Sequence, residues 1–146
     1  MQALNHVVFG SLIALIVNEP VIAIPVALGS HFVLDTIPHY GNDPKAKRGS
    51  KAYNYRIVVD TIASILIVMY FVSYHPPNEL LIMICAFVAV LPDLVWPLAL
   101  TVKHEGPIWA FFKFHKTIQH ESRKGIYLEI VWFMVSTYLV IYTLKH

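Results

Sequence analysis

The chain has little charge and almost no cysteine. Only 14% of its 146 residues are charged and 57% are hydrophobic, whereas a soluble domain typically carries about 25% charged residues. The single cysteine, Cys85, lies inside an apolar run, so it forms no internal disulfide and supplies no cysteine-rich metal motif. A metal ion would therefore need histidine and carboxylate ligands. The net charge of +2 is too small to indicate a nucleic-acid partner.

Several sequence signatures of soluble enzymes are also missing. The chain contains no Gly-rich phosphate loop and no His-Glu-x-x-His motif. The serines have no nearby base that would indicate a Ser-His-Asp triad.

The N-terminus lacks the basic stretch and the small-residue cleavage site of a signal peptide. We therefore expect the first apolar run to remain as a membrane segment.

Long apolar runs dominate the sequence and predict an all-α fold. We expect a polytopic membrane helical bundle of about five transmembrane helices in one integral membrane domain, residues 1–146, because backbone groups in lipid are satisfied within helices. An aromatic and basic stretch, residues 107–120, predicts an additional interfacial or re-entrant helix. The expected spans are residues 4–17, 20–40, 53–74, 79–93 with a kinked extension through 98–102, and 126–144.

The basic residues predict how the bundle is oriented. Ten of the eleven lysines and arginines lie between the second and third spans, at the start of the third (Arg56), or between the fourth and fifth, and only Lys145 lies elsewhere. With five crossings, both basic loops fall on one side, which the positive-inside rule assigns to the cytoplasm. The N-terminus is then cytoplasmic, while the turns at residues 18–20 and 75–78 and the C-terminus face outward.

Potential metal ligands gather at the cytoplasmic ends of these spans. His31 and Asp35 are four residues apart and share one helix face, which His39 continues if the helix persists beyond Pro38. Hydrogen bonding that stabilises a helix end is the alternative interpretation of this triplet. The candidate metal ligands are His31, Asp35, His39, Asp93, His115 and His120.

Other charged residues in the same layer suggest further roles. Asp60 is predicted to activate water or bridge metal ions, although an ion pair with Arg56 would also explain it. His6 is predicted to complete the ligand shell or to act as a general acid. Three basic residues are expected to attract an anionic substrate head group: Lys116, Arg123 and Lys124.

The ligand types predict the class of metal. Histidine and carboxylate ligands without thiolate suit a divalent ion, with zinc or manganese expected first. The candidates outnumber the ligands that one ion needs, which points to two ions. Two ions about 3.5–4 Å apart stabilise both the attacking and the leaving oxygen of a phosphoryl centre.

The pattern resembles the membrane-bound metal-dependent hydrolases, small proteins of the bacterial inner membrane. That family carries a histidine near the N-terminus, a Pro-Asp-x-Asp-His motif ending a hydrophobic helix, and a later His-x-x-x-Thr-His motif. His6 matches the first of these, and His115-Lys-Thr-Ile-Gln-His120 has the spacing of the third, with Gln119 in place of threonine. The middle motif is divided between Pro92-Asp93 and Asp35-Thr-Ile-Pro-His39. The resemblance implies a metal site, hydrolase activity and an inner-membrane location.

The function predicted from the sequence is a metal-dependent hydrolase at the cytoplasmic membrane face. Its expected substrate is a phosphoester of a membrane lipid or lipid-linked molecule, cleaved by metal-activated water. A small transporter or ion-binding protein is a second interpretation, although the centres of the spans contain few polar residues. A histidine-rich iron oxidase acting on lipid and a scaffold with incidental histidines are the remaining alternatives. The oligomeric state is not predicted.

Overall fold

A computed structural model describes residues 1–41, 50–95 and 105–146 and shows an almost entirely helical chain. The elements are α1 (Ala3–Val17), α2 (Pro20–Thr36), β1 (His39–Tyr40), α3 (Lys51–Val72), α4 (Glu79–Leu94), α5 (Gly106–Ile118), β2 (Glu121–Ser122) and α6 (Gly125–Lys145). The all-α prediction is therefore confirmed. The basic residues before Lys51 and the predicted extension at 98–102 lie outside the described residues.

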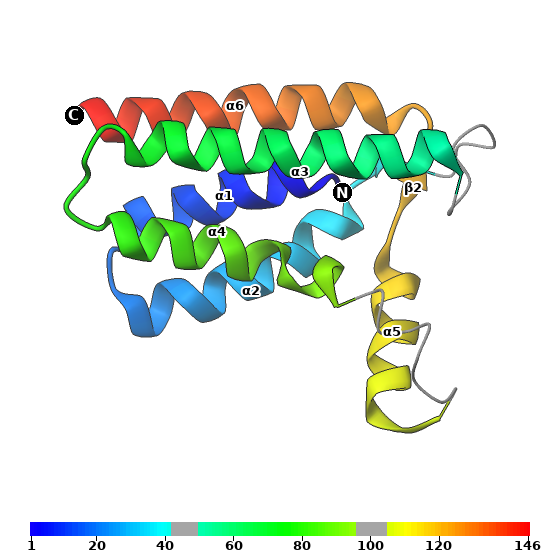
Figure 1. The fold of residues 1–146 in the computed structure, drawn as a ribbon. Helices are drawn as coiled ribbons and strands as arrows, with labels where there is room; N and C mark the ends of the chain where they lie inside the picture. The colour runs from blue at the N-terminus through cyan, green and yellow to red at the C-terminus, as the bar shows by residue number, and fades with distance from the viewer. Residues whose placement is uncertain (42–49, 96–104) are drawn as a thin grey trace.

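Helix α1 forms the centre of the bundle. It packs against α2, α3, α4 and α6, with α3 and α6 on one side and α2 and α4 on the other (Figure 1). Its contact with α4 is close because Gly10 has no side chain: a Cβ there would lie 2.5 Å from the carbonyl oxygen of Cys85. Small residues at such contacts let helix backbones approach one another. The buried cores lie along the same helix.

The bundle has two distinct ends. The α1–α2 and α3–α4 turns and the C-terminus lie at one end, and the N-terminus, α5 and β2 lie at the other (Figure 1). The two turns are tied together by Asn78, whose amide donates to the carbonyl of Ala14 at 2.9 Å and to the side-chain oxygen of Asn18 at 3.1 Å. Asn18 itself ends α1 in the left-handed conformation (φ 48°), which asparagine adopts more readily than most residues.

The N-terminus of α1 is held by carboxylates from two other helices. Asp60 of α3 accepts hydrogen bonds from the amides of Ala3 (2.8 Å) and Leu4 (3.1 Å), and Glu129 of α6 accepts from the amide of Gln2 (2.8 Å). The first amides of a helix have no partner within it, and negative charge is favourable there. These two acids therefore fix the register of α1 against α3 and α6.

Helix α2 ends earlier than the predicted span. The helix stops at Thr36, and Ile37 has an extended backbone (ψ 138°), because Pro38 disfavours the helical conformation of the residue before it. His39 and Tyr40 then pair in parallel with Glu121 and Ser122. This short pairing, which the sequence did not reveal, brings the chain after α5 alongside the end of α2.

Helices α3 and α6 have the length and composition of membrane spans. They contain 22 and 21 residues, and only 11% and 22% of their most apolar windows are buried. A 22-residue helix is about 33 Å long, close to the roughly 30 Å of a bilayer core. Among the described residues, these two helices are long and apolar enough to cross a membrane, whereas α1 and α2 are apolar but shorter. This finding is compatible with a membrane protein, and the five predicted spans stay a prediction.

Candidate metal centre

Four predicted ligands meet at the N-terminal end of the bundle. One ligand atom from each lies within 4.8 Å of the other three. His31 and Asp35 come from the last turns of α2, Asp93 from the last turn of α4, and His115 from the last turn of α5. The prediction that these residues converge therefore holds for the set His31, Asp35, Asp93 and His115.

The separations match those of ligands around one ion. Nε2 of His31 lies 3.0 Å from Nε2 of His115, 3.2 Å from Oδ2 of Asp35 and 3.8 Å from Oδ1 of Asp93. Nε2 of His115 lies 3.0 Å from Oδ2 of Asp35 and 3.7 Å from Oδ1 of Asp93. A tetrahedral site with metal–ligand bonds of about 2.0–2.2 Å has edges of roughly 3.3–3.6 Å. The arrangement therefore fits a single metal ion.

The tautomer of His31 supports the same interpretation. Its Nδ1 lies 2.8 Å from the carbonyl oxygen of Ala89, so this nitrogen carries the proton and donates it. In a neutral ring the Nε2 lone pair then faces two carboxylates, which is unfavourable unless a cation lies between them. Metal-binding histidines commonly donate their other ring N–H to such a carbonyl, which fixes the ring orientation.

Asp35 is the most enclosed member of the cluster. It is fully buried, and its two oxygens face different partners: Oδ2 faces His31 and His115, while Oδ1 ion-pairs with the amino group of Met1 and lies 3.3 Å from Nε2 of His6. His6 is also fully buried and stacks on His31, with ring centroids 4.2 Å apart. His6 therefore lies beside the four-residue cluster, in contact with its carboxylate and one imidazole.

His39 and His120 lie outside the group of four. His39 is buried, and its Nδ1 donates to the carbonyl of Ile37 at 2.9 Å. Burial, followed by the nearby N-terminal positive charge, lowers the pKa of His39 and so favours its neutral form. His120 is exposed, and its main chain bridges Asp35 and His39. Their predicted roles as ligands stay predictions.

The remaining predicted residues have other surroundings. Asp60 uses both carboxylate oxygens to accept hydrogen bonds from the amides at the start of α1, and its predicted role in activating water stays a prediction. The three basic residues expected at a substrate head group, Lys116, Arg123 and Lys124, are exposed and do not line the pocket next to the cluster.

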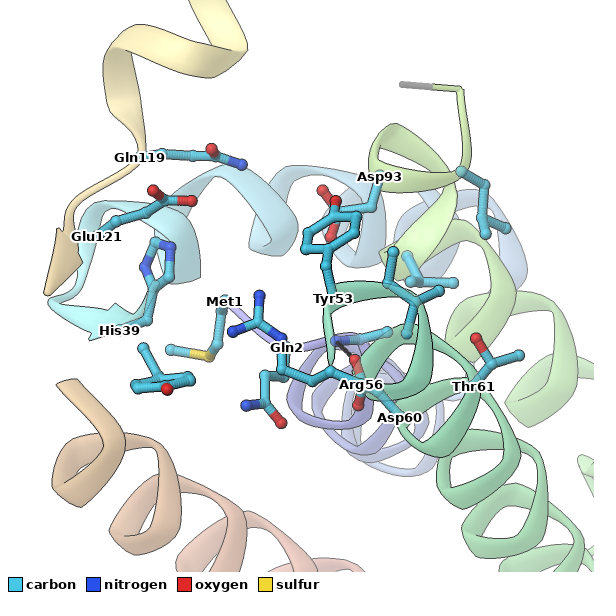
Figure 2. A pocket seen from close by; sticks show the side chains of 15 residues that line it. Met1, Gln2, His39, Tyr53, Arg56, Asp60, Thr61, Asp93, Gln119 and Glu121 are labelled. Carbon is cyan, nitrogen blue, oxygen red and sulfur yellow. Dashed lines mark hydrogen bonds between the residues drawn. The ribbon is translucent and has the colours of Figure 1, made fainter. Parts of the chain in front are cut away.

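That pocket has a volume of about 220 Å³ and reaches the cluster through Asp93. The side chain of Asp93 is 30% exposed, whereas those of the other three residues are buried. The pocket lies between the first turns of α3, the end of α4, the N-terminus and β1 (Figure 2). An ion in the cluster would thus be reached from this side.

Arg56 is the residue in this pocket whose importance sequence reasoning missed. From the sequence alone, Arg56 is expected to be a basic residue near a loop or an ion-pair partner of Asp60. Its spacing of four residues from Asp60, at the start of the third apolar run, is the only signal that the sequence offers. Comparisons with family models, curated proteins and solved structures return no match.

Proposed function

We propose that this chain is an integral membrane protein that binds a divalent metal ion through His31, Asp35, Asp93 and His115 and hydrolyses a phosphoester. The observation that carries the proposal is the cluster of two imidazoles and two carboxylates at ligand-to-ligand separations, open on one side to a pocket. When bound, a divalent ion lowers the pKa of a coordinated water and supplies a nucleophile at neutral pH. Zinc and manganese suit these ligands.

The surroundings of the cluster support a reaction at a membrane face. The cluster lies at one end of a bundle whose α3 and α6 have mostly exposed apolar side chains. We place α1, α2, α3, α4 and α6 across the inner membrane. The N-terminus and the cluster then lie on the cytoplasmic side, as the basic residues predict. A substrate whose ester is at the lipid–water interface, such as a phospholipid or lipid-linked phosphate, would meet the pocket there.

The residues of the chain have distinct parts in this proposal. His31 and His115 bind the ion through Nε2, and the carbonyl of Ala89 holds the ring of His31 in the required orientation. Asp35 neutralises the ion in a buried environment, where charge interactions are strong. His6, 3.3 Å from Asp35, is placed to exchange a proton with the cluster. Asp93 binds the ion and also lines the pocket through which the substrate would approach.

Hydrolysis of phosphoesters by the purified protein tests this proposal. We expect the protein in detergent, supplied with Mn²⁺ or Zn²⁺, to cleave p-nitrophenyl phosphate, bis(p-nitrophenyl) phosphate or phosphatidic acid in mixed micelles. These three substrates distinguish monoester, diester and lipid specificity. Loss of outer-shell partners of a metal typically costs about 10–100-fold, so His115→Ala, which removes a ligand, should reduce the rate by more than about 100-fold.

The control for this assay is His75→Ala, because His75 is exposed in the turn between α3 and α4, and that turn lies at the end of the bundle away from α5 (Figure 1). Its rate should equal that of the wild type. Equal rates for the wild type and His115→Ala, or full activity in chelator-treated protein, would contradict the proposal.

A non-haem iron site is the second candidate. Two histidines and a carboxylate with open positions form the ligand set of many iron(II) oxygenases, and His31, His115 and Asp35 provide such a set. Elemental analysis of protein purified without added metal separates the two. Iron as the main metal, with no phosphoester hydrolysis, would favour the oxidase.

A further inference from the structure

Arg56 gives the pocket beside the cluster a specific chemical character. It extends from α3 across the pocket toward Met1 and His39 (Figure 2). Its guanidinium lies over the rings of Tyr40 and Tyr53, at 5.3 and 5.8 Å from their centroids. Cation–π contacts of this kind stabilise an arginine and limit its conformations. The fork of N–H donors is thus held in place at the pocket wall.

Arg56 also forms no ion pair within the described part of the chain. None of the ion pairs found there involves Arg56. Asp60, one turn along α3, points toward the start of α1 and accepts from its amides (Figure 2). A half-buried guanidinium that is held by aromatic rings and forms no ion pair with the described carboxylates can bind an anion from outside the chain.

The charges around the pocket determine when an anion would bind. Three carboxylates line it, those of Asp60, Asp93 and Glu121, against the single side-chain cation of Arg56. Asp60 is compensated by the amides of α1, and Glu121 is exposed. Asp93 faces the imidazoles of His31 and His115 at 3.8 and 3.7 Å, and a metal ion bound between these side chains would offset its negative charge. The pocket therefore favours an anion in the metal-loaded protein and disfavours it in the metal-free protein.

We infer that Arg56 binds the phosphate group of the substrate, so that the phosphate lies between the metal ion and the guanidinium. This inference rests on the metal site of the proposed function and names the group that the site recognises. Guanidinium groups bind phosphate through two parallel hydrogen bonds. A pocket of about 220 Å³ is smaller than the roughly 300–1,000 Å³ that encloses a drug-sized ligand. It therefore takes a phosphate with a small part of its ester, while the remainder of the molecule lies outside.

Binding of phenylphosphonate, a phosphate ester analogue that is not hydrolysed, tests the inference. Isothermal titration of the Mn²⁺-loaded protein should show binding that Arg56→Gln weakens by about tenfold to a hundredfold, the range for hydrogen bonds to charged groups. Arg56→Lys should weaken it less, because lysine keeps the charge and loses the fork. The matched control is Lys51→Gln, an exposed cation in the first turn of the same helix and outside the pocket, which should bind as the wild type does.

Metal content measured on the same samples separates the two proposals. A wild type that binds no metal overturns the proposed function and this inference with it. Normal metal content with equal affinities in wild type and Arg56→Gln overturns this inference alone. Loss of affinity in a triple variant, Lys116→Gln, Arg123→Gln and Lys124→Gln, with Arg56→Gln unaffected, would place the anion at the exposed basic residues instead. Arg56→Gln should retain the metal, which also reports that it folds.

Discussion

Replacing Asp35 with asparagine should remove the metal ion from the protein. Asp35 has one oxygen against His31 and His115 and the other against His6 and the amino group of Met1. Asparagine keeps the shape and removes the charge, so a cation in the cluster loses its most buried counter-charge. We expect the affinity for Mn²⁺ or Zn²⁺ to fall by more than about 100-fold, beyond the 10–100-fold typical of outer-shell changes. Elemental analysis of purified protein measures it.

Asp60→Asn is the matched control for this experiment. Both aspartates lie at the same end of the bundle, but Asp60 accepts hydrogen bonds from the first amides of α1. Asparagine keeps only one of the two acceptor oxygens and leaves one amide of α1 without a partner. The replacement should therefore leave the metal content unchanged and lower the free energy of unfolding by about 1–3 kcal/mol. Loss of metal from Asp60→Asn with retention by Asp35→Asn would reverse the assignment and restore Asp60 as a ligand.

A pair of lysines in the middle of α3 should prevent stable membrane insertion. Ile62 and Ile65 are 52% and 55% exposed and lie near the centre of this 22-residue helix. A lysine at the centre of a membrane helix costs about 2.5–3.5 kcal/mol, so Ile62→Lys with Ile65→Lys costs roughly 5–7 kcal/mol if the two add. On a soluble protein each exposed substitution would change stability by only about 0.5 kcal/mol or less.

Alkaline carbonate extraction of membranes tests this prediction by measuring how much of the protein stays in the membrane pellet. The wild type should stay in the membrane pellet, and the double lysine variant should be degraded or extracted. Ile108→Lys is the control, because Ile108 is 57% exposed on α5, outside the proposed spans. A wild type found in the soluble fraction, or a double variant that behaves like Ile108→Lys, would show that the exposed face of α3 does not meet lipid.

Much of the helical architecture could be predicted because its signals are local. Apolar runs interrupted at Asn18–Pro20 and at His75–Asn78 indicate where helices end, and the structure places turns at both. His31 and Asp35 could be paired from their spacing on one helix face. Asp93 could be proposed from its isolation in apolar sequence, and it lies in the cluster with them.

The remaining features depend on contacts between distant segments. Spacing alone gives His115 and His120 equal standing, but α5 ends at Ile118 and the chain then pairs with β1. That pairing leaves His115 buried in the cluster and His120 exposed. Arg56 could be recognised only once Tyr40, Tyr53 and Asp60 were in position around it. Asp60 likewise caps α1 through amides that lie 57 and 56 positions away from it in the sequence.

The most direct test of the account is an anomalous-difference map from crystals of the protein loaded with Mn²⁺ or Zn²⁺ and measured at the absorption edge of the metal. We expect a peak about 2.0–2.2 Å from Nε2 of His31, Nε2 of His115 and one carboxylate oxygen each of Asp35 and Asp93, with Asp93 on the pocket side. A map with no peak among these four side chains, from protein that is folded and supplied with metal, would contradict it.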